Sequence, residues 1–556
     1  MVATCLDFPV QWGRRVHWSA TLLASIVLVA TLATLPEYGI TSDEPAIHYA
    51  GEWQLWALFS DHPGRWNLKG PPPPEFESQA HFNRHPKPSD VYLFPGFPAL
   101  FCAAVARVAR HLPGYDQVDA VHAGIAVLHA ATVFFMVLYV SRLLGLRRAL
   151  VVSLLYALYP SAVGHSHYNV KDWPMTGFYT LTVLAFAVGA LESRARWFMQ
   201  AGLWLGLGLA SKPNLVFAVP TLLLWLVIAG HRLYHRDRLP TRLALVAACA
   251  VPAVAGLVFY GAWPYLRAGT IAEQWDKLSE TVAFFLRRAT SHRDTFTPYP
   301  FVLFIAMTPP IDLVGVALAA VLPFRSGARE AVSAALGWVW LAIPLIRIAW
   351  PHSNFYDANR HFLEYVPALA FLAGTGLDLA AARLAALLTP THGVRVARRM
   401  AWGVLLAAFL LAAWPVFRYH PYESMYYNAL VGGLGGAQRT PLTAPYLDKT
   451  ELFTLDSEGD YWGFSYRNAI RNLNRIAPAG ATFYPCGALI DPLTRFQKVR
   501  EDLRRVPREE AEYFIVIPRR TFCTPSDLDY LRDHASVILQ EGRDGGVVFV
   551  IFRRRE

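Results

Sequence analysis

Two adjacent carboxylates, Asp43 and Glu44, follow directly on a long apolar run at residues 18–36. A run of this length is typical of a membrane-crossing helix, so the acid pair is expected where that helix emerges into water. A carboxylate in this place is a candidate general base, which accepts a proton from an attacking hydroxyl group. The alternative is structural, because Asp and Glu also favour the first turn of a helix.

Further charged residues stand at the ends of other apolar runs. Asp172 is a third candidate catalytic acid, although it could instead cap the helix that contains Pro174. Cations at a membrane surface can stabilise the growing negative charge of a phosphate leaving group. The lysines among them could instead extend toward lipid headgroups, and the arginines could be interfacial anchors. The candidate cations are Lys87, Lys212, Arg267 and Arg360.

Two histidines, His165 and His167, lie one residue apart and close to Asp172. Imidazole and carboxylate groups suit divalent metal ions, so a metal site is one interpretation. The other is that these are ordinary histidines at the end of a membrane helix. The five cysteines show no spacing typical of a metal site, and the chain lacks a GxxxxGK[ST] phosphate loop. No cofactor is therefore predicted, and a divalent metal remains an open alternative.

The composition indicates a polytopic membrane protein. Of the 556 residues, 54% are hydrophobic and only 17% are charged, whereas about a quarter are charged in soluble domains. The net charge of +10 comes mostly from arginine. We interpret it as cytoplasmic loop charge in contact with membrane lipids rather than as a nucleic-acid-binding surface.

The apolar runs predict eleven membrane crossings, each of roughly 20 residues or somewhat fewer. They cover residues 18–36, 120–140, 149–164, 173–191, 197–211, 214–230, 243–263, 309–324, 331–349, 362–382 and 400–417. A further apolar run at 91–106 is expected to lie in the interface or to re-enter, because counting it as a crossing breaks the charge pattern.

Without that run, every alternate loop is rich in arginine, which the positive-inside rule places in the cytoplasm. The first large loop, 37–116, and the tail, 418–556, are then non-cytoplasmic. All the candidate site residues fall on that side, at the ends of spans. A transporter is expected to carry ionisable groups near the middle of the membrane, often in paired repeats. The pattern therefore favours an interfacial enzyme in the cell membrane.

The tail changes to the pattern of a soluble α/β domain from about residue 465. We expect a helix at 466–476, strands at 481–485, 513–518, 537–540 and 547–552, and helices near 497–505 and 526–534. Cys486 and Cys523 would lie in an oxidising compartment, where a disulfide between them could form. The chain is thus expected to consist of a membrane domain, 1–417, and a non-cytoplasmic domain, 418–556.

With these motifs in place, the sequence resembles the GT-C superfamily of integral membrane glycosyltransferases, and within it the protein O-mannosyltransferase and aminoarabinose transferase group, family 39. The resemblance covers the layout of residues 18 to 420. It rests on the order and sidedness of short motifs, each weak alone. They are Asp43-Glu44, His85-Pro86-Lys87-Pro88, Lys171-Asp172-Trp173-Pro174, Lys212 after a Gly-rich span, the run Arg360 to Pro367, and Asp460-Tyr461-Trp462-Gly463.

This resemblance implies an all-α GT-C fold and an inverting transfer of a sugar from a polyprenyl-phosphate donor to a hydroxyl of a protein, lipid or glycan. Asp43 would be the base, with Glu44 and Asp172 in support, and the four cations would hold the donor phosphate. Residues that would contact the sugar or the acceptor are Tyr49, His85, His167, Asn169 and His361. The alternatives are a multi-pass transporter or flippase for a lipid-linked sugar, and an inactive scaffold in an envelope assembly.

Overall fold

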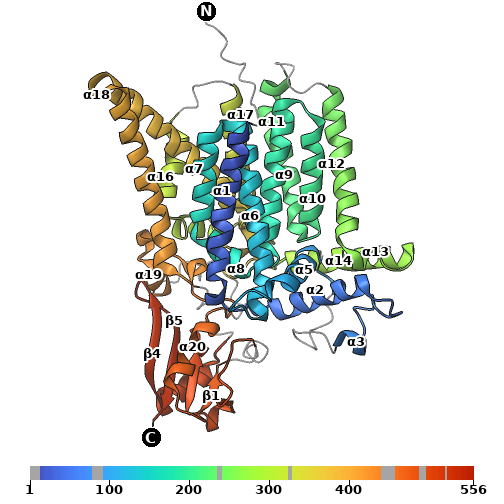
Figure 1. Ribbon diagram of the computed structural model, residues 1–556, viewed down its shortest axis with the longest axis vertical. Coiled ribbons are helices and arrows are strands. Elements are labelled where there is room, and N and C mark those ends of the chain that lie inside the picture. Colours follow the sequence, from blue (N-terminus) through green and yellow to red (C-terminus); the bar gives the residue numbers. More distant parts are fainter. Residues whose placement is uncertain are drawn as a thin grey trace, which may run out of the picture.

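The computed structural model describes residues 13–77, 92–94, 96–234, 241–322, 328–439, 458–486, 496–519 and 522–555. A bundle of long helices forms one part of the molecule, and a small β-sheet lies beyond one end of it (Figure 1). Helix α1 begins at the end of the bundle opposite to the sheet (Figure 1). The end of the bundle next to the sheet is called the site end.

Seven helical segments of the described chain are long and apolar enough to cross a membrane. They contain α1 (Arg14–Thr34), α6 (Gln117–Leu144), α9 (Asp172–Glu192), α11 (Ala218–Tyr234), α12 (Thr241–Ala262), α17 (Ala328–Ala349) and α18 (Tyr365–Tyr419). Two bent pairs bring the number to nine. They are α7 (Leu146–Leu158) with α8 (Pro160–Tyr168), and α15 (Tyr299–Ala306) with α16 (Pro310–Val321).

The expected number of eleven differs from this count because of two segments. Helix α10 (Ala195–Leu209) has only 15 residues, yet it packs between α9 and α12 as a member of the bundle (Figure 1). Helix α18 has 55 residues but contains two arms, because Gly393 interrupts it with a φ of 75°. That conformation is readily available to glycine alone, so the chain can reverse there. The two arms correspond to the runs expected at 362–382 and 400–417.

Close helix contacts in the bundle depend on small residues. A Cβ atom on Gly376 of α18 would lie 2.0 Å from the carbonyl oxygen of Gly315 in α16. Membrane helices approach this closely only where side chains are absent or small. This packing fixes the first arm of α18, and with it the segment before Tyr365 that enters the site.

Several shorter helices lie at the site end. Helices α2 (Glu44–Phe59) and α14 (Ile271–Ala289) run across the axis of the bundle (Figure 1). The apolar run expected to stay in the interface forms α5 (Phe97–Ala109), whose 13 residues make a helix only about 20 Å long. The remaining short helices here are α3 (Pro74–Glu77), α13 (Pro264–Arg267) and α19 (Gly433–Arg439).

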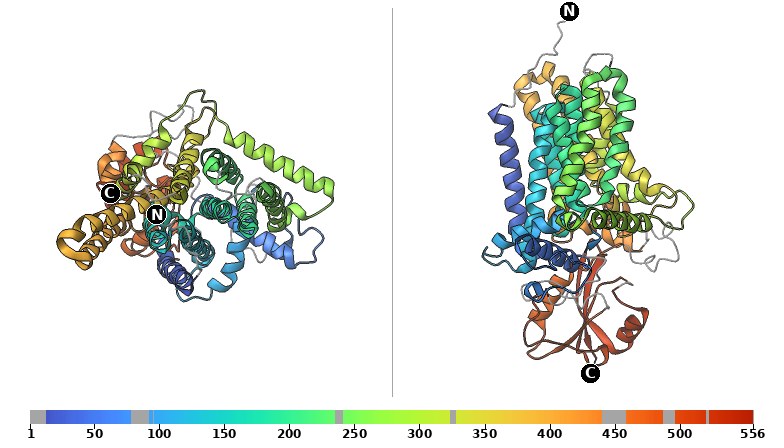
Figure 2. Two further views of the ribbon diagram at one scale, coloured as in Figure 1. Left: turned by 90° about the horizontal axis from the view of Figure 1, so that it is seen from above. Right: turned by 90° about the vertical axis from the view of Figure 1, so that its right-hand side faces the viewer.

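The C-terminal region carries a five-stranded mixed sheet of order β2-β1-β3-β5-β4 beyond the bundle (Figure 2). Strand β1 pairs in parallel with β2 and β3, whereas β5 is antiparallel to both β3 and β4. The strands are β1 (Thr482–Pro485), β2 (Arg504–Arg505), β3 (Tyr513–Val516), β4 (Ala535–Arg543) and β5 (Gly546–Arg554). The helices are α20 (Tyr466–Ile476) and α22 (Pro525–His534).

One expected helix of this region, 497–505, is wrong. The segment forms turns and then the short strand β2. Lys498 has a φ of 51°, which a right-handed helix does not allow. The Arg500 guanidinium donates to the backbone oxygens of Asn474 and Ala477 and also pairs with Asp502. These tertiary contacts fix an extended path that the local sequence pattern does not reveal.

Candidate active site

Four segments that are far apart in the sequence meet at the site end. Asp43 directly precedes α2, Asp172 is the first residue of α9, and Lys212 directly precedes the 3-10 helix Pro213–Phe217. Arg360 begins the 3-10 helix Arg360–Phe362, just before α18. Each of these residues stands at a helix terminus because the helices end at this face of the bundle. The convergence expected from the apolar runs is therefore present for these four.

Asp43 faces a cavity and is held by two cations. Its Oδ2 atom accepts from Lys171 Nζ at 3.1 Å and from Arg360 Nη1 at 3.2 Å. The Asp43 side chain is still 37% exposed, whereas that of Arg360 is only 5% exposed. Asp43 is thus the accessible member of the group, fixed from one side and open on the other.

The electrostatics of Asp43 favour its charged form. Burial raises the pKa of this carboxyl, but the Lys171 ammonium and the Arg360 guanidinium outweigh burial and bring the pKa down to about 2. Asp43 is therefore ionised at neutral pH, as a general base must be before it accepts a proton.

Asp172 forms a separate, buried ion pair. Its Oδ1 atom accepts from Lys212 Nζ at 2.7 Å, and its side chain is 1% exposed. Its backbone N–H donates to Asn169 Oδ1 at 2.9 Å, and Asn169 Nδ2 approaches Asp172 Oδ2 at 3.4 Å. The Asn169 amide therefore orients Asp172, and Asp172 is not the cap considered for it, because the N-cap residue of α9 is Lys171. A buried charge needs an opposite charge beside it, so Asp172 also fixes the position of the Lys212 ammonium.

Arg360 connects the two acids. Besides Asp43, its guanidinium pairs with Asp357 at 3.0 Å through Nη2, and its Nε lies 4.0 Å from Asp172 Oδ2. The guanidinium also lies over the Trp462 ring, 4.2 Å from the centroid, in a cation–π contact. The Asp460 carboxylate accepts hydrogen bonds from the backbone N–H groups of Trp462 and Gly463. These bonds fix the conformation of the loop that carries Trp462. The tail motif around Asp460 is thus a wall of the site.

Two cavities meet at Arg360. The smaller, of about 270 Å³, is the more polar of the two and is lined by Asp43, Lys171 and residues of the C-terminal region such as Trp462. The larger, of about 470 Å³, has mainly apolar walls from η2 (Pro213–Phe217), α12, α14 and α17, and it contains Lys212. Phe94, Lys171, Arg288, Tyr356 and Arg360 line both. The arrangement offers one space for a polar group beside a base and another for an apolar chain beside cations.

Glu44 does not line either cavity, although it is adjacent to Asp43 in sequence. It is buried, and its Oε2 atom accepts from His122 at 2.6 Å and from His48 at 2.9 Å. The other oxygen accepts from the Thr41 N–H at 2.9 Å. Burial raises the pKa of Glu44, but the two imidazoles outweigh burial and lower it to about 2. Glu44 thus connects α2 to α6, and its expected catalytic role in support of Asp43 stays a prediction.

The described residues place a metal-capable cluster at this glutamate and not at the expected histidine pair. Glu44, His48 and His122 offer three converging ligand atoms of the type that binds Zn²⁺, at spacings that are also those of hydrogen bonds to a charged acceptor. His165 contacts Asn169, whereas His167 contacts Thr34 and stacks on Tyr38. The metal site considered as one interpretation of His165 and His167 has no support among the described residues, because the two imidazoles have different partners.

The other expected residues have mixed outcomes. His361 lines the larger cavity, where its buried Nε2 has no hydrogen-bond partner among the described residues. Burial lowers the pKa of His361 well below its usual value, so the ring is neutral. Tyr49 packs against Trp53 and Phe76, away from both cavities. His167 is likewise absent from both linings. A sugar contact by either is not supported by this geometry.

The predicted phosphate contact of Arg267 also has no support here. Arg267 is exposed at the end of α13, outside both cavities. His85 and Lys87 lie outside the described residues, so their expected roles stay predictions.

Four cations and an acid that line the cavities were not among the residues predicted from the sequence; they are Lys171, Arg288, Arg347, Arg519 and Asp357. Lys171 is next to Asp172 in the motif Lys171-Asp172-Trp173-Pro174, so its position at the end of a span could have identified it as a site residue. Arg347 sits near the end of α17, where an arginine in an apolar helix is itself a functional signal. Asp357 lies three residues before Arg360 in the same loop, so its position before a span was likewise an available signal. Arg519 offered no local signal, because its importance arises from a contact across the chain.

Comparisons with known proteins agree with this fold. Residues 99–255 match the family model described as dolichyl-phosphate-mannose-protein mannosyltransferase. A search of curated proteins gave no match.

The chain is similar to ArnT from Cupriavidus metallidurans bound to undecaprenyl phosphate, with a TM-score of 0.51, 14% identity, and coverage of 96% of this chain and 98% of that one. The apo state of ArnT has a TM-score of 0.50 and 13% identity, with coverage of 96% of this chain and 97% of that one. The apo form of the Archaeoglobus fulgidus oligosaccharyltransferase has a TM-score of 0.44 and 12% identity, with coverage of 91% of this chain and 70% of that one. The chain thus has the fold of ArnT, and its central helices match the mannosyltransferase family model.

Proposed function

We propose that this protein transfers a sugar, with inversion, from a polyprenyl-phosphate donor to a hydroxyl group of a protein, lipid or glycan. The observation that carries the proposal is the meeting of the two cavities at Arg360, with Asp43 in the polar one and Lys212 in the apolar one. The site end would face the non-cytoplasmic side of the cell membrane, as the arginine-rich loops indicate.

The larger cavity suits the donor. Its volume of about 470 Å³ falls in the range of small-molecule sites. Its walls are apolar, as a polyprenyl chain requires, and the Lys212, Arg347 and Arg360 side chains stand at the polar part of the lining. ArnT, which shares the fold, has been crystallised with undecaprenyl phosphate. The donor phosphate would lie against these cations, with the sugar directed toward the smaller cavity.

The smaller cavity suits the acceptor. A hydroxyl that enters it reaches Asp43, which accepts its proton while the oxygen attacks the anomeric carbon of the sugar. The bond from that carbon to the phosphate oxygen breaks, and its electron pair leaves with the lipid phosphate. Cations already in place at the leaving group stabilise the growing charge without reorganisation. Attack opposite to the leaving group inverts the anomeric centre, so a single base is sufficient.

Arg360 gives this site a way to respond to the donor. A phosphate that attracts the Arg360 guanidinium weakens the hold of that cation on Asp43. The pKa of Asp43 then rises from its low value, because a neighbouring positive charge is partly withdrawn. Asp43 would therefore become a stronger base only when the donor is bound.

The test uses purified protein in detergent with a panel of polyprenyl-phosphate sugars. We expect release of polyprenyl phosphate with one sugar class, and a product whose anomeric configuration, read by NMR, is inverted. A transporter or flippase would bind such lipids and leave them intact, since detergent offers no second side. Absence of turnover with every donor and acceptor class would overturn the proposal.

A further inference from the structure

The C-terminal region reaches into the smaller cavity through Arg519 and Phe522. Arg519 follows β3 and is 6% exposed. Its Nη2 atom donates to Asp357 Oδ1 at 2.6 Å, and the other oxygen of Asp357 accepts from Arg360 Nη2 at 3.0 Å. Asp357 therefore bridges two guanidinium groups, one from the C-terminal region and one that also holds Asp43.

The backbone at Asp357 needs such a restraint. Asp357 and Ala358 have φ values of 58° and 53°, which residues other than glycine rarely adopt. Two consecutive residues in this region persist only when surrounding contacts determine the conformation. The Tyr299 hydroxyl donates to the Ala358 carbonyl oxygen at 3.0 Å, and Arg519 holds the Asp357 side chain. The same turn leads directly to Arg360.

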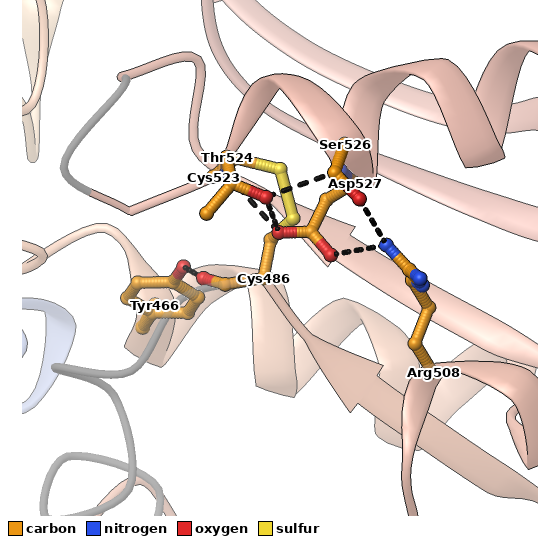
Figure 3. The surroundings of a disulfide bond; sticks show 7 residues. All are labelled: Tyr466, Cys486, Arg508, Cys523, Thr524, Ser526 and Asp527. Carbon is orange, nitrogen blue, oxygen red and sulfur yellow. Dashed lines mark hydrogen bonds and ion pairs between the residues drawn. A yellow bond between two sulfur atoms is a disulfide. The ribbon is translucent and has the colours of Figure 1, made fainter.

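Arg519 is itself held firmly within the C-terminal region. Its carbonyl oxygen accepts from the N–H groups of Phe522 and Cys523, both at 2.9 Å. Cys523 forms a disulfide with Cys486, which follows β1, and Tyr466 donates to the Cys486 carbonyl oxygen (Figure 3). The short segment that carries Arg519 is thus attached to the sheet on both sides, so its guanidinium is presented at a fixed place.

We propose that Arg519 is a positioning residue for sugar transfer, which acts through Asp357 and Arg360 to hold Asp43 in place. The C-terminal region then completes the active site rather than only covering it. This inference rests on the proposed function. It predicts that Asp43 loses part of its orientation, and Arg360 part of its bond to Asp43, when Arg519 no longer holds Asp357.

The experiment compares Arg519→Gln with a matched control, Arg508→Gln, in the full-length protein. Arg508 pairs with Asp527 in the same region but lines neither cavity. We expect Arg519→Gln to lower kcat by up to about 100-fold, as misplacement of a reacting group does. The donor-lipid Kd should rise far less than kcat falls, because Lys212 and Arg347 still line the donor cavity. The acid limb of the pH profile should move to higher pH. Arg519→Lys should recover part of kcat, and Arg508→Gln should behave like the wild type.

A second measurement does not depend on activity. Hydrogen exchange of the segment 353–362 should accelerate in Arg519→Gln and stay unchanged in Arg508→Gln. If Arg519→Gln unfolds the C-terminal region, Asp357→Asn breaks the same link from the membrane domain and should give the same kcat and exchange effects. Wild-type kcat together with wild-type exchange in either variant would overturn the inference. A wild-type protein that transfers no sugar would refute the proposed function, and the exchange data would still decide whether Arg519 fixes this segment.

Discussion

Arg360 Nη1 donates to Asp43 Oδ2 at 3.2 Å, although 317 residues separate the two in the chain. Arg360 lines both cavities, so this contact joins the candidate base to the candidate donor site. A negative charge that binds Arg360 in the larger cavity therefore changes the pKa of Asp43 in the smaller one. Substitutions at either cavity are therefore expected to affect the chemistry of Asp43.

Replacing Asp43 by Asn should abolish transfer. The amide keeps the shape of the carboxylate but cannot accept a proton at neutral pH, so the rate should fall by about 10²–10⁴. Turnover of the purified variant measures this, and donor binding by the same protein should be nearly unchanged. Asn is a good helix cap, so a merely structural role for Asp43 predicts a silent substitution instead. Turnover close to that of the wild type would remove Asp43 as the base.

Replacing Lys171 by Met should shift the pH dependence. Lys171 stabilises the ionised form of Asp43, so its removal raises the pKa of Asp43 above its present value of about 2. The acid limb of kcat/KM should therefore move to higher pH, since the base must be deprotonated to act. Lys69→Met is the control, because Lys69 pairs with Glu280 outside both cavities. An unchanged acid limb in Lys171→Met would contradict the assignment.

Variants of the Lys212–Asp172 ion pair should show separate effects on protein stability and on donor binding. Lys212→Met leaves Asp172 buried without its closest cation, which destabilises by about 3–5 kcal/mol. The double variant with Asp172→Asn should recover most of the thermal stability. Donor affinity should stay low in both, by about tenfold or more, because a charge-assisted contact to the phosphate is gone. Wild-type donor binding in the double variant would assign Lys212 a purely structural role.

Replacing Glu44 by Gln should affect stability more than chemistry. The buried carboxylate accepts from two imidazoles, and losing its charge should cost about 1.5–3 kcal/mol. We expect a lower Tm, with transfer by the folded protein reduced far less than in Asp43→Asn. The contact distances of 2.6 and 2.9 Å are those of hydrogen bonds to a charged acceptor, the first of them short. A chelator should therefore leave the Tm of the wild type unchanged, and a drop in Tm would identify a bound metal.

Reporter fusions test the sidedness. A reporter after Glu556 should be active only outside the cytoplasm, and one after Arg236 only inside, because the arginine-rich loops favour the cytoplasm. A cytoplasmic C-terminus would place the site end on the wrong side for a non-cytoplasmic transferase.

The sequence by itself determined the features that depend on local pattern. Apolar runs predicted the membrane helices, because crossing the bilayer requires long apolar segments. The alternating pattern predicted β3 and β5 of the tail, and the acids and cations at span ends indicated Asp43, Asp172, Lys212 and Arg360. Helix termini that share one face of a bundle must lie near each other, so these four could be grouped without coordinates.

Only the tertiary structure decided which of these groups form the site. Asp43 and Glu44 are neighbours in sequence, but Asp43 lies just before α2 and Glu44 is its first residue, so one faces the cavity and the other faces His122. Arg267 and Arg360 look equivalent in the sequence, yet only the segment of Arg360 folds back against Asp43. Asp357 and Arg519 meet across 162 residues, and contacts of that kind depend on the packing of the whole chain.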